Sequence, residues 1–316
     1  MNASRDERGA GAPPGRALRS VQEAIARALG EHLPGGVRTG ELDRDGRALR
    51  WVEAGRGGVA PVVLIAGCGT TALSWSAVLP ELARYGRVVA YDRAGLGASD
   101  PDRAFAAPTL DGQIADLAAL VRHLDAGPAL LVGHSWGAQL AQLLAWQRPE
   151  LVAGLVLVDP AHEEFQPRSI RLAEAVLTRL WLYRVASASA ASRPTSPDPG
   201  EPLVRAEAAV IGHRHQRRAV LAEQRLTALA ATAIRRRRSA ARPVGVPLAV
   251  LSATRGLPGA VRVRWTALQA GVARRAVRGT HGTVHGAGHV IQADRPRAVV
   301  AAVREVSEHA RYFLKE

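Results

Sequence analysis

A serine set between glycines is the clearest chemical signal in this sequence. Ser135 lies in LLVGHSWGAQL (130–140), where it fits the pattern Gly-x-Ser-x-Gly at the end of an apolar run. A serine hydroxyl acts as a nucleophile only with a base to accept its proton, a group to orient that base, and donors that stabilise the oxyanion. The alternative interpretation is a polar residue at a tight turn. The apolar runs on both sides predict a strand and then a helix, which favours the nucleophile.

Three histidines near the carboxyl end are candidates for the base. GTHGTVHGAGHVIQ contains His281, His285 and His289, at spacings that also suit metal ligands on a helix. The glycines of this stretch disfavour a helix, so we expect no metal site. His289 follows Gly-Ala-Gly and precedes a helical pattern, which predicts a loop after the last strand. We therefore predict that His289 is the general base, and that His281 and His285 lie on or beside that strand.

Two backbone N–H groups are expected to stabilise the oxyanion. One belongs to Trp136, the residue after the serine, and the other to Cys68 in the glycine-containing loop IAGCGTT. Gly67 and Gly69 let this backbone approach a ligand closely. Neither a base nor a cation stands beside Cys68 in the loop, so we expect its side chain to serve as a small apolar group.

These groups must be positioned by a sheet, and the pattern along the chain predicts one. Residues 61–67, 87–93, 129–135, 154–160 and 247–253 are near-continuous aliphatic runs, typical of parallel strands buried on both faces. Helical patterns alternate with them and predict right-handed crossovers in an open α/β sheet. They cover residues 109–124, 138–147, 265–276 and 296–313. Before the sheet strands, Asp45-Gly46 between two short alternating runs predicts a hairpin.

One long insertion separates two of the strands. Residues 161–245 carry helical stretches with apolar faces around a Pro/Ser-rich break, which favours a helical cap; a partly disordered loop region is the alternative. We therefore expect a disordered basic tail (1–20), the first part of the core (21–160), the cap (161–245) and the second part of the core (246–316).

The motifs IAGCGTT, YDRAGLGASD, GHSWGAQ, LVDPAH and GAGHVIQADRP, in this order, resemble the α/β-hydrolase fold family in its serine-nucleophile, cap-bearing branch. The resemblance covers residues from about 47 to 313. It implies a mostly parallel, doubly wound sheet with an inserted helical cap. The aspartate and glycines of YDRAGLGASD are expected to stabilise that loop, not to catalyse. One departure is Ala66-Gly67, where the family usually has His-Gly; a backbone donor does not depend on that side chain.

The acid of the triad is expected at a less common place in this chain. The family's acid most often follows the strand after the cap, but no Asp or Glu occurs between Gln224 and Ala293. A second position known in the family follows the strand after the nucleophile helix, which here ends in Asp159. We predict that Asp159 orients His289; a strand-end aspartate that caps a turn is the alternative. Glu163 and Glu164 are reserve candidates.

The resemblance implies a serine hydrolase that cleaves a carboxylic ester, lactone or thioester, with no cofactor and no metal. Epoxide hydrolases and haloalkane dehalogenases share the fold but use an aspartate nucleophile. Trp75, Trp136 and Trp181 suggest an apolar substrate portion, with Gly67 and His162 also lining the pocket; core packing is the alternative for the tryptophans. A C–C or amide hydrolase, a perhydrolase and a non-catalytic ligand-binding homologue remain open.

The charge of the chain raises the question of an anionic partner. The formal net charge is +14, but the arginines are spread along the whole sequence and only Arg235–Arg238 form a dense run. We expect this run to be a solvent-exposed helix face, with a nucleic acid, an anionic membrane surface or an acidic substrate as the alternative partner. No apolar stretch is long enough to span a bilayer. A single cysteine and no secretory signal favour the cytoplasm.

Overall fold

An eight-stranded sheet forms the centre of the structure, a computed structural model that describes residues 14–31, 33–102, 107–165, 176, 179–180 and 202–313. The strands follow the order β1-β2-β4-β3-β5-β6-β7-β8. Strands β1 and β2 form an antiparallel hairpin, β2 pairs antiparallel with β4, and every other neighbouring pair is parallel. The strands are β1 (Arg38–Asp43), β2 (Ala48–Ala54), β3 (Val62–Ile65), β4 (Val88–Tyr91), β5 (Ala129–His134), β6 (Val152–Val158), β7 (Leu248–Ala253) and β8 (Gly279–Val284).

The predicted hairpin is present, and its turn chemistry explains it. Asp45 and Gly46 have φ values of 57° and 80°, the left-handed region that a tight hairpin turn requires. The Gly46 N–H also donates to the Asp43 carboxylate at 2.6 Å. The β1–β2 register then places Gly40 against Trp51, where a Cβ on the glycine would lie 2.3 Å from the indole ring.

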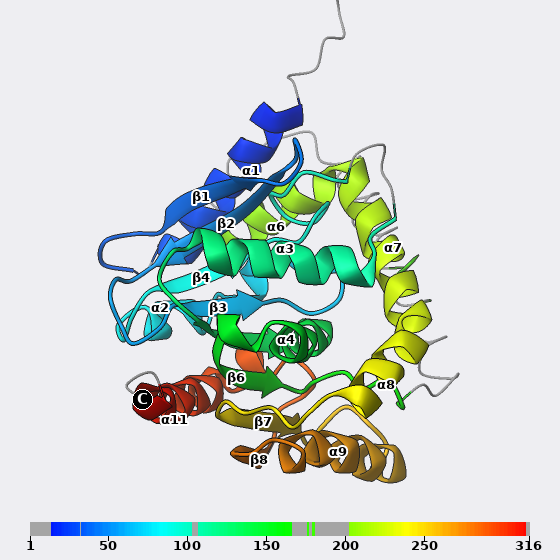
Figure 1. The fold of residues 1–316 in the computed structure, drawn as a ribbon. Coiled ribbons are helices and arrows are strands. Elements are labelled where there is room, and N and C mark those ends of the chain that lie inside the picture. The colour runs from blue at the N-terminus through cyan, green and yellow to red at the C-terminus, as the bar shows by residue number, and fades with distance from the viewer. Residues whose placement is uncertain are drawn as a thin grey trace, which may run out of the picture.

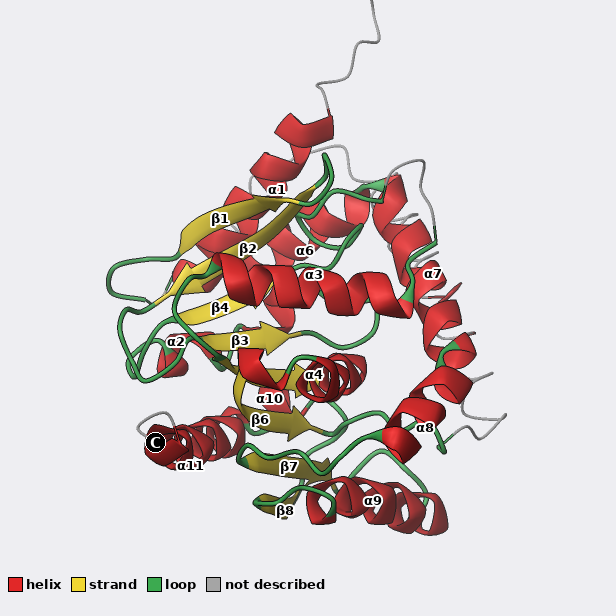
Figure 2. Ribbon diagram, in the orientation of Figure 1, coloured by secondary structure: helices red, strands yellow, loops and turns green. Residues whose placement is uncertain are grey.

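Helices cover both faces of the sheet (Figures 1 and 2). One apolar cluster joins α1, α2, α6, α10 and α11 to one face, and a second joins α3, α4, α8 and α9 to the other, so the doubly wound fold is confirmed. The helices are α1 (Pro14–Gly30), α2 (Leu79–Leu82), α3 (Leu110–His123), α4 (Trp136–Gln147), α6 (Pro202–Gly212), α7 (Arg214–Leu229), α8 (Ala231–Ala240), α9 (Gly259–Arg274), α10 (Ile291–Asp294) and α11 (Pro296–Phe313), with 3-10 turns at Ala72–Trp75 and Pro149–Leu151.

The N-terminal segment differs from the expected disordered tail (1–20). Helix α1 begins at Pro14, so residues 14–20 are helical and do not belong to a disordered tail. Its apolar side packs into the core through Val21 and Ile25. In the described part of the insertion, α6, α7 and α8 follow one another, and α7 lies across the end of the sheet to which the arrows of the parallel strands point (Figure 1). The Pro/Ser-rich break and Trp181 lie outside the described residues.

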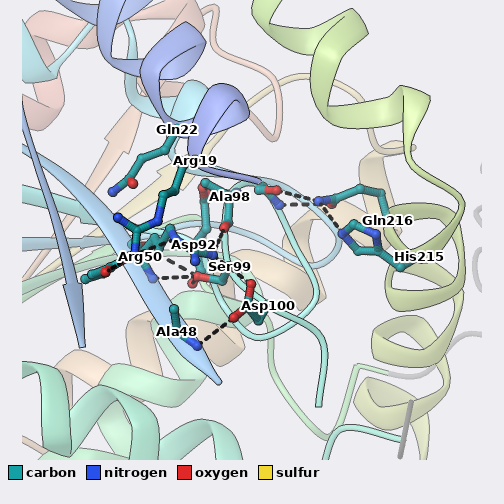
Figure 3. Close-up of polar contacts among 12 residues, drawn as sticks. Arg19, Gln22, Ala48, Arg50, Asp92, Ala98, Ser99, Asp100, His215 and Gln216 are labelled. Carbon is teal, nitrogen blue, oxygen red and sulfur yellow. Dashed lines mark hydrogen bonds and ion pairs between the residues drawn. The ribbon is translucent and has the colours of Figure 1, made fainter. Parts of the chain in front are cut away.

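The loop after β4 is held by buried polar contacts (Figure 3). The Asp92 carboxylate accepts from the backbone N–H groups of Ala72 and Ala98, each at 2.8 Å, and Gly97 leaves no room for a Cβ, which would lie 2.0 Å from Asp92 Oδ2. Burial raises the pKa of Asp92 to about 6, although both backbone donors favour the charged form. Arg50 adds donations to the Ala98 carbonyl and to Asp100, both at 2.8 Å. The loop is therefore structural, as the sequence predicts.

Candidate active site

Ser135 occupies a sharp turn between β5 and α4. Its φ of 51° and ψ of −112° are rare for a residue with a side chain, and such strain persists only where the surroundings enforce it. The flanking glycines are required by packing, since a Cβ on Gly137 would lie 2.2 Å from the Ile65 carbonyl oxygen. The Ser135 N–H donates to the Val158 carbonyl at 3.1 Å, and the Ala161 N–H donates to the Ser135 carbonyl at 3.1 Å. The turn is thus fixed from both sides.

His289 and Asp159 are brought together from distant parts of the chain. His289 Nδ1 lies 2.6 Å from Asp159 Oδ2. A carboxylate only accepts hydrogen bonds, so Nδ1 carries the proton and Nε2 is left with the lone pair that a general base needs. The imidazole side chain is 51% exposed while the Asp159 side chain is 3% exposed. A buried acid therefore orients a histidine that remains accessible from solvent.

The second oxygen of Asp159 is held by three donors. Oδ1 accepts from the Ala253 N–H at 3.1 Å, from the Trp265 indole at 3.0 Å and from the Gln269 amide at 3.0 Å. Burial by itself raises the pKa of Asp159, but the contact with His289 and the hydrogen bonds from Ala253 and Trp265 outweigh it and hold the pKa below its ordinary value. The carboxylate is therefore charged when it faces the imidazole.

Trp265 and Gln269 are site residues that the sequence analysis missed. They stand four residues apart on α9, so they share one face of the helix, and that face covers Asp159. The Gln269 oxygen accepts from the buried Ser252 hydroxyl, which fixes the amide nitrogen toward Asp159. Because the Ser252 hydroxyl donates its proton to Gln269, it accepts from His281 Nε2 at 2.8 Å. His281 lies on β8, as predicted. The signal in the sequence that could have indicated them is a tryptophan and a glutamine at helical spacing after the buried strand β7.

The other carboxylates near this edge have different partners. Glu163 forms a buried ion pair with Arg238, with a side chain 0% exposed, and Glu164 is exposed. Asp294 accepts from the Gly288 N–H at 2.7 Å and so braces the histidine loop. Among the described residues, Asp159 is the carboxylate that contacts His289.

His134 supports the loop that carries His289. Its Nε2 lies 2.9 Å from the His289 carbonyl oxygen, and because a carbonyl only accepts, Nε2 is the protonated nitrogen. Burial lowers the pKa of His134 to about 3, and the nearby His289 adds to this shift, so the ring is neutral at neutral pH. Gly67 packs against the ring, since a Cβ there would lie 2.7 Å from Nδ1. The histidine loop, the nucleophile turn and the Gly67 loop are therefore in contact with one another.

The loop that carries Cys68 is fixed by Arg93. The buried guanidinium donates to the Ala66 carbonyl at 2.7 Å and to the Gly67 carbonyl at 2.6 Å. Cys68 is partly exposed, at the same sheet edge as Ser135. The Trp136 N–H opens helix α4, where the positive end of the helix dipole favours negative charge.

The residues suggested as pocket lining have different environments. Trp75 is fully buried in the core cluster of α1 and α2, and Trp136 is 1% exposed in the opposite cluster, so both pack in the core and do not offer an open apolar wall. His162 is buried beside Glu163, and its Nδ1 accepts from the Glu164 N–H at 3.2 Å. A surface cavity of about 360 Å³ lies at the other end of the sheet, beside Arg278 and His309 where β7 and β8 begin.

The arginine run on α8 differs from the expected solvent-exposed face. Arg235 and Arg236 are exposed, but Arg237 donates to Asp111 at 2.7 Å and Arg238 is buried against Glu163. The last two arginines of the run therefore form ion pairs that hold α8 against the rest of the protein. In the part of the chain that the structure describes, no helix is long and apolar enough to cross a membrane, and no three His, Cys, Asp or Glu side chains cluster as metal ligands.

The chain belongs to the alpha/beta hydrolase family, because the model of that family matches residues 62–303. The fold agrees. A solved alpha/beta hydrolase fold protein from Burkholderia ambifaria superposes with a TM-score of 0.61 and 24% identity, over 84% of this chain and 97% of that one. At this identity the likeness shows the fold alone.

Curated relatives match over shorter stretches. The chain is 39% identical over 116 residues to the dihydrolipoyllysine-residue acetyltransferase component of an acetoin cleaving system from Pseudomonas putida (37% of this chain, 31% of that protein). It is 38% identical over 116 residues to epoxide hydrolase A from Mycobacterium tuberculosis (36% of this chain, 35% of that protein). The chain thus spans about a third of the length of these relatives.

Proposed function

We propose that this protein is a serine hydrolase that cleaves a carboxylic ester, lactone or thioester through an acyl-enzyme on Ser135. The observation that carries the proposal is the 2.6 Å contact between His289 and Asp159 at the sheet edge where the strained Ser135 turn lies. Three roles of a nucleophilic triad are then filled by residues of the right types. The family contains hydrolases of several kinds, so the bond that is cleaved belongs to the proposal.

The reaction proceeds in two halves. His289 Nε2 accepts the Ser135 proton while Oγ attacks the acyl carbon, and the N–H groups of Cys68 and Trp136 stabilise the resulting oxyanion. The proton then passes from His289 to the leaving alcohol or thiol as its bond to the acyl carbon breaks. Water repeats the same steps on the acyl-enzyme and releases the acid. Asp159 stays ionised throughout and stabilises the imidazolium that forms twice in each turnover.

The serine separates this proposal from the activity of the epoxide hydrolases among the relatives. Epoxide opening in this fold uses a carboxylate nucleophile, which forms an ester intermediate with the substrate. Position 135 carries a hydroxyl instead. A serine supported by a histidine that a buried carboxylate orients suits attack on an acyl carbon, where an oxyanion forms beside the backbone donors.

A panel of p-nitrophenyl esters of increasing acyl length tests the proposal. The wild-type protein is expected to hydrolyse at least one ester, and Ser135→Ala is expected to lower kcat by about 10³-fold or more. Hydrolysis that survives in Ser135→Ala would contradict the proposal. So would a wild-type protein that binds the esters without turning them over, the result expected of a non-catalytic homologue.

A further inference from the structure

Helix α7 reaches the predicted oxyanion loop through one buried carboxylate. Glu223 has a side chain that is 2% exposed, and four hydrogen-bond donors point at its two oxygens. Oε1 accepts from Arg93 Nε at 2.7 Å and from the Gln113 amide at 2.6 Å. Oε2 accepts from Arg93 Nη2 at 2.7 Å and from the Gly69 N–H. A charged group buried to this extent needs such a complete set of partners.

The contacts of Arg93 bear directly on the Cys68 N–H. The Gly67 carbonyl and the Cys68 N–H belong to one planar, trans peptide unit, so fixing the carbonyl oxygen also fixes the direction of the N–H. Arg93 Nη2 holds that oxygen at 2.6 Å. Glu223 holds the same guanidinium from the other side and binds the following amide, that of Gly69. The peptide that carries the first oxyanion donor is thus anchored on both sides.

The second oxyanion donor is linked to the same carboxylate. Gln113 of α3 donates to Glu223 Oε1, and its own carbonyl accepts from the Trp136 indole at 2.8 Å. The indole belongs to the residue whose backbone N–H opens α4 beside Ser135. A single side chain on α7 therefore connects to both predicted donors, one through Arg93 and one through Gln113.

We propose that Glu223 is a positioning residue that aligns the Cys68 and Trp136 N–H groups for oxyanion stabilisation, so that docking of α7 completes the site. This inference rests on the proposed function. Burial alone lowers the pKa of Arg93, but the charge and hydrogen bonds of Glu223 outweigh it and raise the pKa, so the guanidinium stays charged. A neutral amide at position 223 offers one oxygen to four donors, and at least one anchor must be lost.

The variant Glu223→Gln tests this role. Misaligned donors stabilise the transition state less, while substrate binding in the ground state hardly depends on them. We therefore expect kcat to fall about 10- to 100-fold while KM changes little. A trifluoromethyl ketone with the acyl group of the fastest-hydrolysed ester forms a hemiketal with the serine, and the hemiketal oxyanion needs the same two N–H donors. The inhibition constant of the ketone is therefore expected to rise by the same factor as kcat/KM falls, whereas the inhibition constant of the product acid stays the same. Equal losses with both inhibitors, or unchanged kcat, would overturn the proposal.

Gln216 provides a matched control on the same face of the same helix. Its amide accepts from the Gly97 N–H at 2.9 Å and donates to the Gly97 carbonyl, so these hydrogen bonds dock α7 on the loop after β4 and not on residues 66–71 (Figure 3). Gln216→Ala is expected to loosen α7 and keep kcat and the ketone inhibition constant within about threefold. If both variants lower kcat alike, α7 acts only by its packing and the role assigned to Glu223 is wrong.

Two further measurements keep the test decisive. Glu223→Asp retains the charge opposite Arg93 but is one methylene shorter, so it is expected to fold and still lose several-fold in kcat. Hydrogen exchange of the Gly69 amide needs no substrate, and it is expected to accelerate in Glu223→Gln but not in Gln216→Ala. Unchanged exchange overturns the anchoring even if the protein proves inactive on esters. If the wild-type protein hydrolyses none of the esters, that result contradicts the proposed function but not the anchoring by Glu223.

Discussion

Asp159 contacts the imidazole of His289 at 2.6 Å across a separation of 130 residues, from the end of the strand beside the nucleophile strand. Strand β6 pairs with β5, so the acid and Ser135 follow neighbouring strands at one edge of the sheet. The strand after the insertion, β7, contributes the Ala253 N–H to Asp159 instead of a carboxylate. The predicted acid thus follows β6, whereas the resemblance places the more common acid position after the strand that follows the insertion.

Asp159→Asn is expected to lower kcat by about 10²- to 10⁴-fold with little change in KM. The amide fits the space of the carboxylate but cannot stabilise an imidazolium, and its NH₂ group favours the wrong tautomer of His289. Ester hydrolysis at saturating substrate measures the effect. Glu164→Gln serves as the comparison, because Glu164 is exposed and is the nearby reserve candidate whose change should leave stability intact. A larger loss in Glu164→Gln than in Asp159→Asn would show that Asp159 is not the acid.

Gln269→Leu is expected to weaken the support of Asp159 without removing the acid. The change deletes one of three donors to Oδ1 and leaves the Ser252 hydroxyl without its acceptor. A hydrogen bond to a charged group contributes about 1.5–3 kcal/mol, so a loss of that order in unfolding free energy is expected, together with a several-fold fall in kcat. Denaturant unfolding and ester kinetics measure the two effects. Arg264→Gln, an exposed change on the same helix, should leave both near wild type.

The depressed pKa of Asp159 predicts a pH dependence of stability. The ordinary value is 3.8 and the folded value is lower, so between them the unfolded chain binds more protons than the folded one. The stabilisation from the charged form is therefore complete above the ordinary value and is lost as the pH falls through the folded value. The difference in unfolding free energy between wild type and Asp159→Asn should therefore shrink as the pH falls below about 4. A difference that grows as the pH falls below about 4 would show that the pKa of Asp159 is raised, not lowered, in the folded protein.

The buried ion pair between Arg238 and Glu163 is expected to stabilise the packing of α8 against the core. The two side chains are 7% and 0% exposed, and Gln142 adds a contact to the guanidinium at 3.2 Å. Removing one partner leaves an uncompensated buried charge, so Glu163→Gln should lower the unfolding free energy by about 3–5 kcal/mol. Glu164→Gln, an exposed neighbour, should change it by less than about 0.5 kcal/mol. Equal effects in thermal or urea unfolding would show that the pair contributes no more than a surface charge.

Gly137→Ala is expected to damage folding and the site together. The added Cβ would lie 2.2 Å from the Ile65 carbonyl oxygen, a backbone atom that cannot move without shifting β3. Helix α4 must then retreat from the sheet and carry Ser135 with it. Circular dichroism should show a destabilised or unfolded protein, whereas Gly212→Ala, at a glycine with open space around it, should retain the wild-type melting temperature. A stable and active Gly137→Ala protein would contradict the close packing of the turn.

Most of the fold follows from local patterns in the sequence. Continuous aliphatic runs predict the parallel strands, and Asp45-Gly46 predicts the hairpin because its turn needs positive φ values. The roles of Trp265, Gln269 and Glu223 cannot be predicted from the sequence, for a common reason. Each is an ordinary polar or aromatic residue of an amphipathic helix, and its role arises only when that helix packs against a strand end. The burial of Arg238 within its run does not follow from the local sequence, because its partner, Glu163, lies 75 residues away.

Covalent labelling of Ser135 tests the central claim most directly. The protein is incubated with a fluorophosphonate and digested, and the modified peptide is identified by mass spectrometry. The account predicts a single adduct on the peptide that contains Ser135, which is absent in Ser135→Ala and strongly slowed in His289→Ala. An unlabelled wild-type protein, or an adduct that persists in Ser135→Ala, would contradict it.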